Sequence, residues 1–346
     1  MDSIVFFEIE EWEKDFIQKS YPDKKILFTI NKAHEETSSD LFNASVISIF
    51  IYSNLDAATL SKFSNLKLIA TRSTGFDHID LSFCKEKNIY VVNVPNYGAH
   101  TVTQHTFALI LAISRKLIPT IDQSRRGHFS LEGLRGFDLA GKTIGIVGAG
   151  NIGSKVIKIA LSFEMKVLVN TKHPPSEKSQ ENVRYVSFDE LVSSSDIVTL
   201  HVPHTPETHH LINMENIKKF KKGSILINTA RGPLVETQAI LEGLETGILK
   251  AAGLDVLEEE CSLKEERELL TEEFLKKCDI KAQLLNHVLL DRDDVIYTSH
   301  NAFNSNEALM QILHVTVGNI SSFFQGRPQN TVTFLSRNLV YQQSTH

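Results

Sequence analysis

The stretch from Lys142 to Lys172 limits what this chain can fold into, because it predicts a strand, a glycine turn, a helix and a second strand in immediate succession. The run Lys142–Gly148 is short and rich in β-branched residues, which is typical of a buried parallel strand. The segment Gly148–Gly153 follows, then a helix expected to reach about Glu164 and an apolar strand at Lys166–Asn170. This order favours a doubly wound α/β sheet with a ligand at the glycine turn.

The turn reads Gly148-Ala-Gly-Asn-Ile-Gly153, and each of its glycines has a separate role. The first permits a tight turn, the second lets the backbone approach a pyrophosphate, and the third lets the helix pack closely on the strand. The amides at the start of the helix carry partial positive charge toward the phosphates. We therefore predict a dinucleotide site, the alternative being a tight turn that binds nothing. The predicted contacts are Gly148, Gly150, Asn151, Ile152 and Gly153.

The end of the second strand bears on which dinucleotide is bound. An NAD site normally places Asp or Glu there, where it accepts hydrogen bonds from the adenosine ribose. This sequence has Thr171 and Lys172 instead, and no carboxylate between Lys166 and Lys172. A hydroxyl beside a cation tolerates a 2′-phosphate, so we predict NAD(P)(H) as cofactor with NADP(H) favoured. The alternative is that Lys172 is an exposed loop residue of an NAD enzyme.

Length, charge and cysteine content narrow the class of protein. With 346 residues the chain has room for two domains, and its net charge of −6 argues against nucleic acid as a partner. The sequence has an odd number of cysteines, and none of them form a CxxC pair: Cys84, Cys261 and Cys278. This pattern argues against a disulfide framework and favours a reducing compartment. The acidic N-terminus does not resemble a signal peptide, and no apolar run has membrane-spanning length. We expect a cytoplasmic protein with no membrane partner.

The first hundred residues alternate apolar runs with polar amphipathic segments, a pattern that predicts a smaller parallel-sheet domain. A helix follows at about Ala99–Arg115, and its apolar part, 107–113, suggests burial against the other domain or against a second copy in a homodimer. Pro119 follows this helix, and we expect 125–138 to be irregular. Near the end we expect a surface helix over about 262–281 and a final helix over about Ser305–Phe324. Between those two helices, residues with i, i+4 spacing are expected to be buried: Leu284, Leu285, Val288 and Leu289.

Polar and charged side chains follow the predicted strands of the second half. Asn228–Gly232 contains Arg231, Asp255 follows a strand at about 251–256, and His300 follows one at about 294–298. Ligands of doubly wound sheets bind at the carboxyl ends of the strands. An arginine, a carboxylate and a histidine are therefore expected at one edge of the sheet.

With these motifs the chain resembles the D-isomer-specific 2-hydroxyacid dehydrogenases, and among them most closely the D-lactate dehydrogenases. The resemblance extends over nearly the whole chain, in the family's order and spacing. It implies two Rossmann-like or flavodoxin-like parallel-sheet domains, with a substrate-binding domain of residues 1–99 and 301–346 and an inserted dinucleotide-binding domain of residues 100–300. The segments that carry it are Gly75–Asp80, Val94–Tyr97, Leu109–Lys116, Gly136–Lys142, Gly148–Gly153, Thr205–Thr208, Asn228–Gly232, Leu254–Glu260 and His300–Phe303.

The resemblance implies a role for each of three catalytic residues. Arg231 would bind the substrate carboxylate and polarise the 2-oxo group, for which a permanently charged, bidentate guanidinium is suited. His300 would donate a proton to the ketone oxygen as hydride arrives from nicotinamide. Glu260 would hydrogen-bond the imidazole and favour its charged form.

Other positions are implied to bind cofactor or substrate. Asp255 is expected near the nicotinamide, while Thr74 and Gly75 would offer amides to the substrate carboxylate and Tyr97 and Phe303 would line the side-chain pocket. The remaining predicted cofactor contacts are Thr171, Lys172, Val202, Pro203, Thr208, Thr229 and Ala230.

Each assignment has an ordinary alternative. His300 could be a surface residue, Arg231 could cap a helix, and Glu260 could be part of a solvated acidic run. The family commonly has Pro where Cys261 and Ser299 stand, and an apolar residue in place of His204. A metal could be held by the histidines near His204, but hydride transfer to a ketone beside Arg231 and His300 needs none, so we expect no metal.

The implied activity is reversible reduction of a small 2-oxo acid to the D-2-hydroxy acid, with pyruvate as first candidate. Reduction of glyoxylate or hydroxypyruvate is the alternative within the class. A formate-oxidising relative would have Gln in place of Glu260. A non-catalytic, dinucleotide-sensing interaction protein is the alternative from another class, because some relatives act as transcriptional co-repressors.

The cofactor prediction is tested by the substitution Thr171→Asp. A carboxylate at this position would accept hydrogen bonds from the ribose and repel a 2′-phosphate, so the ratio of NADPH-dependent to NADH-dependent activity should fall. Steady-state rates with both reduced cofactors measure the ratio. An unchanged ratio would contradict the prediction.

Overall fold

A computed structural model describes residues 3–174, 182–258 and 280–332. The chain divides into two compact units, which are Met1–Tyr97 with Ser305–His346, and Gly98–Asn304. Among the described residues, no helix is long and apolar enough to cross a membrane. The expected helix over 262–281 lies almost entirely outside the described residues.

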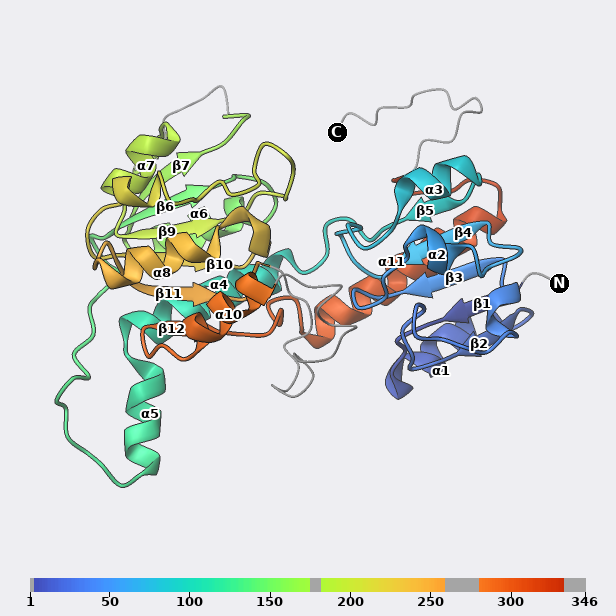
Figure 1. The fold of residues 1–346 in the computed structure, drawn as a ribbon, viewed down its shortest axis with the longest axis horizontal. Coiled ribbons are helices and arrows are strands. Elements are labelled where there is room, and N and C mark those ends of the chain that lie inside the picture. The colour runs from blue at the N-terminus through green and yellow to red at the C-terminus, as the bar shows by residue number, and fades with distance from the viewer. Residues whose placement is uncertain (1–2, 175–181, 259–279, 333–346) are drawn as a thin grey trace. The chain divides into compact units, whose positions relative to one another are not determined.

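The first unit contains one sheet of five parallel strands in the order β2-β1-β3-β4-β5 (Figure 1). Within the described residues of this unit, four α-helices cover the sheet. The strands are β1 (Ser3–Phe6), β2 (Lys25–Phe28), β3 (Val46–Ile49), β4 (Leu68–Thr71) and β5 (Tyr90–Val92), and the helices are α1 (Glu11–Ser20), α2 (Ala57–Leu60), α3 (Leu81–Glu86) and α11 (Asn306–Phe324).

Alternate residues of these strands face opposite sides of the sheet, and each side has its own core. Ile4 and Phe6 of β1 pack with Ile17 of α1 and with Leu313 of α11. Val5 packs on the other side, in the cluster that contains residues of α2 and α3. Both faces are thus covered by helices, as parallel sheets require.

The strand order of the first unit reverses between β1 and β3, where a doubly wound sheet commonly binds its ligand. Here the carboxylate of Glu8 occupies that position. It accepts hydrogen bonds from the amides of Phe50 and Tyr52, both at 2.8 Å, and from the hydroxyl of Ser53 at 2.5 Å. The chain therefore supplies its own anion at this crevice.

The second unit contains seven parallel strands in the order β12-β11-β10-β9-β6-β7-β8. The prediction of two parallel-sheet α/β domains is therefore confirmed. The strands are β6 (Thr143–Val147), β7 (Lys166–Asn170), β8 (Val183–Tyr185), β9 (Ile197–Leu200), β10 (Ser224–Asn228), β11 (Leu249–Leu254) and β12 (Val295–Tyr297), and the helices are α4 (Ala99–Ser114), α5 (Leu117–Arg125), α6 (Gly153–Ser162), α7 (Phe188–Ser194), α8 (Thr237–Glu245) and α10 (Ile280–Leu290).

Helices α4 and α6 cover one face of this sheet, and α7, α8 and α10 cover the other. The apolar residues Phe107, Leu109, Ile110 and Ile113 of α4 are buried in the core of their own unit. They need no second chain to cover them, so the reason given above for a homodimer was wrong. The prediction that the residues of α10 with i, i+4 spacing are buried was also wrong in part, because Leu284 and Val288 are exposed.

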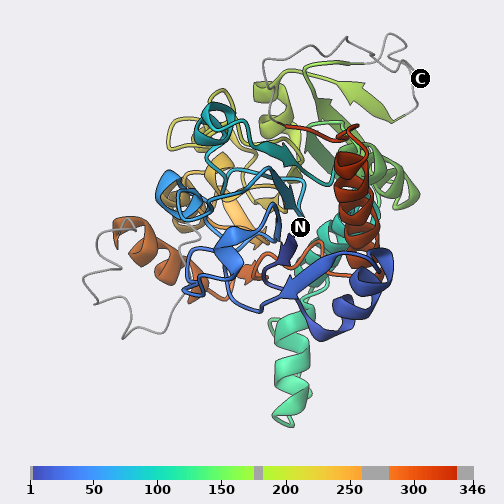
Figure 2. The same cartoon turned by 90° about the vertical axis from the view of Figure 1, so that its right-hand side faces the viewer.

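Helix α5 was not predicted from the sequence. It contains Pro119 in its first turn, where proline is tolerated. Figures 1 and 2 both show α5 extending away from the sheet of its unit. Helix α4 ends at Ser114, and the chain comes back to this point at Phe137, whose amide donates to the carbonyl of Ser114 at 2.9 Å. We call residues 115–136 the arm.

Candidate active site

The glycine turn lies between β6 and α6, where the strand order of the second unit reverses. Gly148 has φ +94°, and a Cβ there would lie 2.5 Å from the carbonyl oxygen of His201. A Cβ on Gly153 would lie 1.9 Å from the carbonyl oxygen of Gly148, whereas one on Gly150 would meet no atom within 4 Å. Two glycines are therefore required by the fold, while Gly150 leaves open space above the turn.

The amino end of α6 follows this open space. Ile152 is its N-cap residue, and no side chain makes a capping hydrogen bond there. Uncapped amides and their partial positive charge suit an anion such as a pyrophosphate. The residues of the turn, Gly148 to Gly153, thus fit a bound dinucleotide.

His201 follows β9 and lies beneath the turn, a position that sequence reasoning did not assign. Its amide donates to the carbonyl of Val147 at 2.7 Å, and its Nε2 lies 3.0 Å from the hydroxyl of Thr199. Burial lowers the pKa of His201 to about 3. The imidazole is therefore neutral at physiological pH and adds no charge to the glycine turn.

The predicted cofactor contacts after β9 form a compact turn next to the glycines. A Cβ on Gly148 would lie 2.7 Å from Cγ1 of Val202. The hydroxyl of Thr208 donates to the carbonyl of Pro203 at 2.7 Å and accepts from the amide of Thr205 at 2.8 Å. Thr208 thus holds the shape of this turn.

The end of β7 carries Thr171, which is partly exposed, and Lys172, which is exposed. The carboxylate of Glu207 also lies near Lys172, which the sequence analysis did not predict. Hydrogen bonds, chiefly that from Thr205, and the nearby charge of Lys172 lower the pKa of Glu207. Glu207 and Lys172 are therefore near each other although they are far apart in the chain.

Three neighbouring strands end level with one another, which brings their following residues to one edge. Asn228 of β10 pairs with Leu254 of β11, and Leu254 pairs with Tyr297 of β12. Arg231 follows Asn228 by three residues, Asp255 follows Leu254 directly, and His300 follows Tyr297 by three residues. The sequence-based expectation for the arginine, the aspartate and the histidine agrees with this register. Glu260 lies outside the described residues.

Asn228 fixes the turn that carries Arg231 and was not singled out in the sequence. Its side-chain amide donates to the carbonyl of Arg231 at 2.8 Å, and its Oδ1 accepts from the amide of Ala230 at 3.1 Å. Thr229 is buried with its hydroxyl 3.0 Å from that of Thr106 in α4. Arg231 itself donates to the carbonyl of Ala230 at 2.7 Å.

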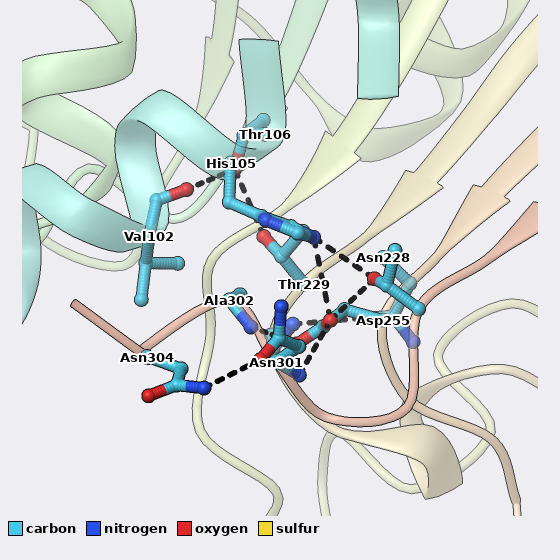
Figure 3. Close-up of polar contacts among 11 residues, drawn as sticks. Val102, His105, Thr106, Asn228, Thr229, Asp255, Asn301, Ala302 and Asn304 are labelled. Atoms are coloured by element: carbon cyan, nitrogen blue, oxygen red, sulfur yellow. Dashed lines mark hydrogen bonds and ion pairs between the residues drawn. The ribbon is translucent and has the colours of Figure 1, made fainter. Parts of the chain in front are cut away.

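Asp255 is buried and accepts hydrogen bonds from the segment that follows β12 (Figure 3). The donors are the hydroxyl of Thr298 at 2.5 Å and the amides of Asn301 and Ala302, both at 2.9 Å. Burial alone would raise the pKa of Asp255, but these bonds and that from His105 outweigh it and lower the pKa. The carboxylate is therefore charged, and it fixes residues 298–302.

His300 has a left-handed backbone with φ +50°. This conformation costs a residue other than glycine about 1–3 kcal/mol and persists only where the surroundings enforce it. The amide of His300 donates to the carbonyls of Asp255 and Thr298, both at 2.8 Å. The rings of Phe303 and His300 pack edge to face, with 6.2 Å between their centroids.

Thr74, Gly75 and Tyr97 belong to the first unit. The hydroxyl of Thr74 donates to the carbonyl of Val94 at 2.8 Å, and the carbonyl of Thr74 accepts from the side-chain amide of Asn93. The carbonyl of Gly75 accepts from the hydroxyl of Ser73 at 2.6 Å. This loop is thus tightly held, and its role in substrate binding stays a prediction.

The histidines after β9 contact one another and an acidic residue. Nε2 of His204 lies 3.2 Å from Nδ1 of His209, His209 stacks on His210, and His210 bonds to Glu258. Within the described residues, no group of three or more His, Cys, Asp or Glu side chains is arranged to hold a metal ion.

The fold and the glycine turn are typical of a dinucleotide-binding protein of the doubly wound type. Residues 107–302 match the family model "D-isomer specific 2-hydroxyacid dehydrogenase, NAD binding domain". This match covers more than half of the chain, which therefore belongs to the D-isomer-specific 2-hydroxyacid dehydrogenases, a family of oxidoreductases, and contains their NAD-binding domain.

Curated proteins and solved structures agree with the family assignment. A 2-hydroxyacid dehydrogenase homolog of Haemophilus influenzae is 36% identical over 82% of this chain and 83% of its own length. The D-lactate dehydrogenase of Escherichia coli is 32% identical over 88% of this chain and 94% of its own. The structure of D-lactate dehydrogenase from Aquifex aeolicus, complexed with NAD and lactic acid, is 34% identical, with a TM-score of 0.83 over 96% of this chain and 100% of that chain.

The glycine turn predicts opposite results for two substitutions of the same kind. Gly153→Ala should lower the free energy of unfolding by about 1–3 kcal/mol, because its Cβ would meet the carbonyl of Gly148. Gly150→Ala should leave stability unchanged but weaken NADH binding about tenfold, because the methyl group would enter the open space where the backbone must approach the pyrophosphate. Urea denaturation and NADH fluorescence titration measure the two effects. Equal stability losses in both variants would contradict this account.

Proposed function

We propose that the protein catalyses the reversible, NAD(P)H-dependent reduction of a small 2-oxo acid to the D-2-hydroxy acid. The observation that carries the proposal is the level ending of β10, β11 and β12, after which Arg231, Asp255 and His300 follow. All three residues lie within 107–302, the range that matches the family's NAD-binding domain.

In this proposal Arg231 binds the substrate carboxylate and polarises the adjacent ketone, because a guanidinium offers two parallel donors and a permanent charge. NAD(P)H, when held by the glycine turn, would be the source of the hydride that C2 of the substrate receives. His300 donates its proton to the ketone oxygen, so that the oxo acid gains one hydride and one proton and becomes the hydroxy acid. Glu260 is proposed to hydrogen-bond His300 and favour its charged form.

Pyruvate is the substrate that we propose first. The Aquifex aeolicus structure contains lactic acid, and the Escherichia coli relative is a D-lactate dehydrogenase. The ring of Phe303, 6.2 Å from that of His300, offers an apolar surface for a short side chain. Assays of a panel of 2-oxo acids, including glyoxylate and hydroxypyruvate, with both reduced cofactors test this assignment.

We further propose that NADP(H) is accepted, since Thr171 and Lys172 stand where an NAD site normally has a carboxylate. Glu207 lies close enough to Lys172 for their charges to interact.

The cytoplasm is the compartment that we propose. Cys84 is a buried free thiol. Burial, with a smaller effect of Asp80, raises the pKa of Cys84 to about 12, so the thiol is protonated and unreactive at neutral pH.

A homodimer is proposed on the basis of the arm. Five of its apolar side chains are exposed, among them Phe129 at 81% and Leu131 at 84%. A group of exposed apolar side chains on a projecting segment commonly marks an interface, and a second copy offers the same surface about a two-fold axis. The exposed apolar residues of the arm are Leu117, Ile118, Ile121, Phe129 and Leu131.

Sedimentation velocity tests the homodimer. The wild-type chain should sediment as a dimer, and the double substitution Ile118→Asp, Phe129→Asp should yield monomers, because buried carboxylates without partners oppose association. Ile30→Asp is the matched control, since Ile30 is 80% exposed in the first unit and outside the arm. A dimeric double variant, or a monomeric wild type, would contradict the proposal.

The substitution His300→Asn tests the catalytic assignment. It keeps a hydrogen-bonding side chain but removes the transferable proton, so reduction of pyruvate should slow by about 100- to 10,000-fold while NADH affinity stays nearly unchanged. The wild-type reduction rate should also fall as pH rises, because the proton donor must be charged. Steady-state kinetics across pH and NADH fluorescence titration provide the measurements. Retained turnover in the variant, or a wild-type rate that rises into alkali, would refute the role.

A further inference from the structure

His105 lies on α4, about two hundred residues before the segment that carries His300, and it reaches that segment with its side chain. Nε2 of His105 is 2.8 Å from the hydroxyl oxygen of Thr298 and 3.4 Å from Oδ1 of Asp255. Figure 3 shows the imidazole directed from α4 toward Asp255. No sequence motif assigned a role to this histidine.

The hydrogen bonds at this point fix the direction of each donor. The hydroxyl of Thr298 has one proton and donates it to Oδ1 of Asp255. Thr298 can therefore only accept from His105, so Nε2 of the imidazole must carry a proton. The result is a directed chain from His105 through Thr298 to the carboxylate of Asp255.

This row of hydrogen bonds ends at Asp255, which also holds the segment that contains His300. The side chain of Asp255 accepts hydrogen bonds from the amides of Asn301 and Ala302, and its backbone carbonyl accepts one from the amide of His300. His300 needs such support, because its backbone is left-handed. Removing the donor at His105 would leave the hydroxyl oxygen of Thr298 without this hydrogen bond and would remove the imidazole from one side of Asp255.

Packing alone gives no reason for a histidine here. Helix α4 covers the sheet with apolar residues such as Phe107 and Ile110, which are buried. His105 is 18% exposed at its side chain, and an apolar residue of similar size would fill the same space without the cost of burying a polar ring. The neighbouring Thr106 also makes a polar contact, to Thr229 after β10. Two successive residues of α4 thus contact the segments that follow three strands.

We propose that His105 is a positioning residue, which acts through Thr298 and Asp255 to hold His300 in the orientation needed for proton transfer. The inference rests on the proposed function, in which His300 is the proton donor. If His105 acts in this way, its substitution should affect the chemical step rather than cofactor binding.

The test compares His105→Leu with His105→Gln. Leucine removes the donor, so kcat for pyruvate reduction should fall about ten- to 100-fold, since small displacements of a catalytic group cost this much. The amide nitrogen of glutamine can take the place of Nε2, so His105→Gln should recover most of the lost rate. The NADH dissociation constant should be unchanged in both. Gln104→Leu, at the exposed neighbouring position on α4, is the matched control and should behave as the wild type.

A second pair of variants applies the same test if His105→Leu does not fold. Thr298→Val removes the hydroxyl with little change of shape, while Thr298→Ser keeps it, so only the valine variant should lose kcat. Hydrogen exchange of the peptide that covers 298–302 should be faster in the donor-removing variants than in the wild type, because the segment is less well held.

The outcomes separate the inference from the proposed function. No turnover by the wild type with any 2-oxo acid would refute the proposed function. Wild-type turnover with an unchanged kcat in His105→Leu and in Thr298→Val would refute only the inference. Equal losses in the leucine, glutamine and Gln104→Leu variants would also overturn it, because the effect would then not depend on the donated hydrogen bond.

Discussion

The buried carboxylate of Asp255 is the interaction on which the arrangement of this site depends. A charge that is removed from water costs several kcal/mol unless hydrogen bonds compensate it. Here the compensation comes from Thr298, from the amides of Asn301 and Ala302, and from His105. Satisfying one charge thus orders the segment after β12 and ties it to α4 and to the end of β11.

The two sheets use their crevices differently, although both are parallel and doubly wound. In the first unit, the crevice between β1 and β3 is filled by the carboxylate of Glu8, which takes the available amides of Phe50 and Tyr52. In the second unit, the corresponding crevice has glycines and the uncapped start of α6, so amides and space remain for a ligand's phosphates. Glu8 thus takes the amides that a phosphate would need at the first crevice, whereas the glycine turn of the second unit suits the phosphates of a dinucleotide.

The sequence predicted those features that depend on neighbouring residues in the chain. The strands, the glycine turn and the polar residues at strand ends all have local patterns, and parallel pairing then brings Asp255 and His300 together. It failed where the environment decides. Phe107–Ile113 looked like an interface, but the sheet of the same unit covers it. The contribution of His105 could not be predicted, because its partners, Asp255 and Thr298, lie more than a hundred residues away in the chain.

Glu258 is the part of the acidic run that the structure describes, and its contacts give it a role that the sequence leaves open. Gly232, next to Arg231, lies so close to the backbone of Leu257 that a Cβ would be 1.8 Å from its carbonyl oxygen. Glu258 follows directly, and its Oε2 accepts from the amide and the hydroxyl of Thr237 at the start of α8, while Oε1 bonds to His210. Both oxygens of Glu258 are thus used to hold α8 and the turn after β9. The carboxylate of Glu258 therefore serves a structural purpose within its own unit.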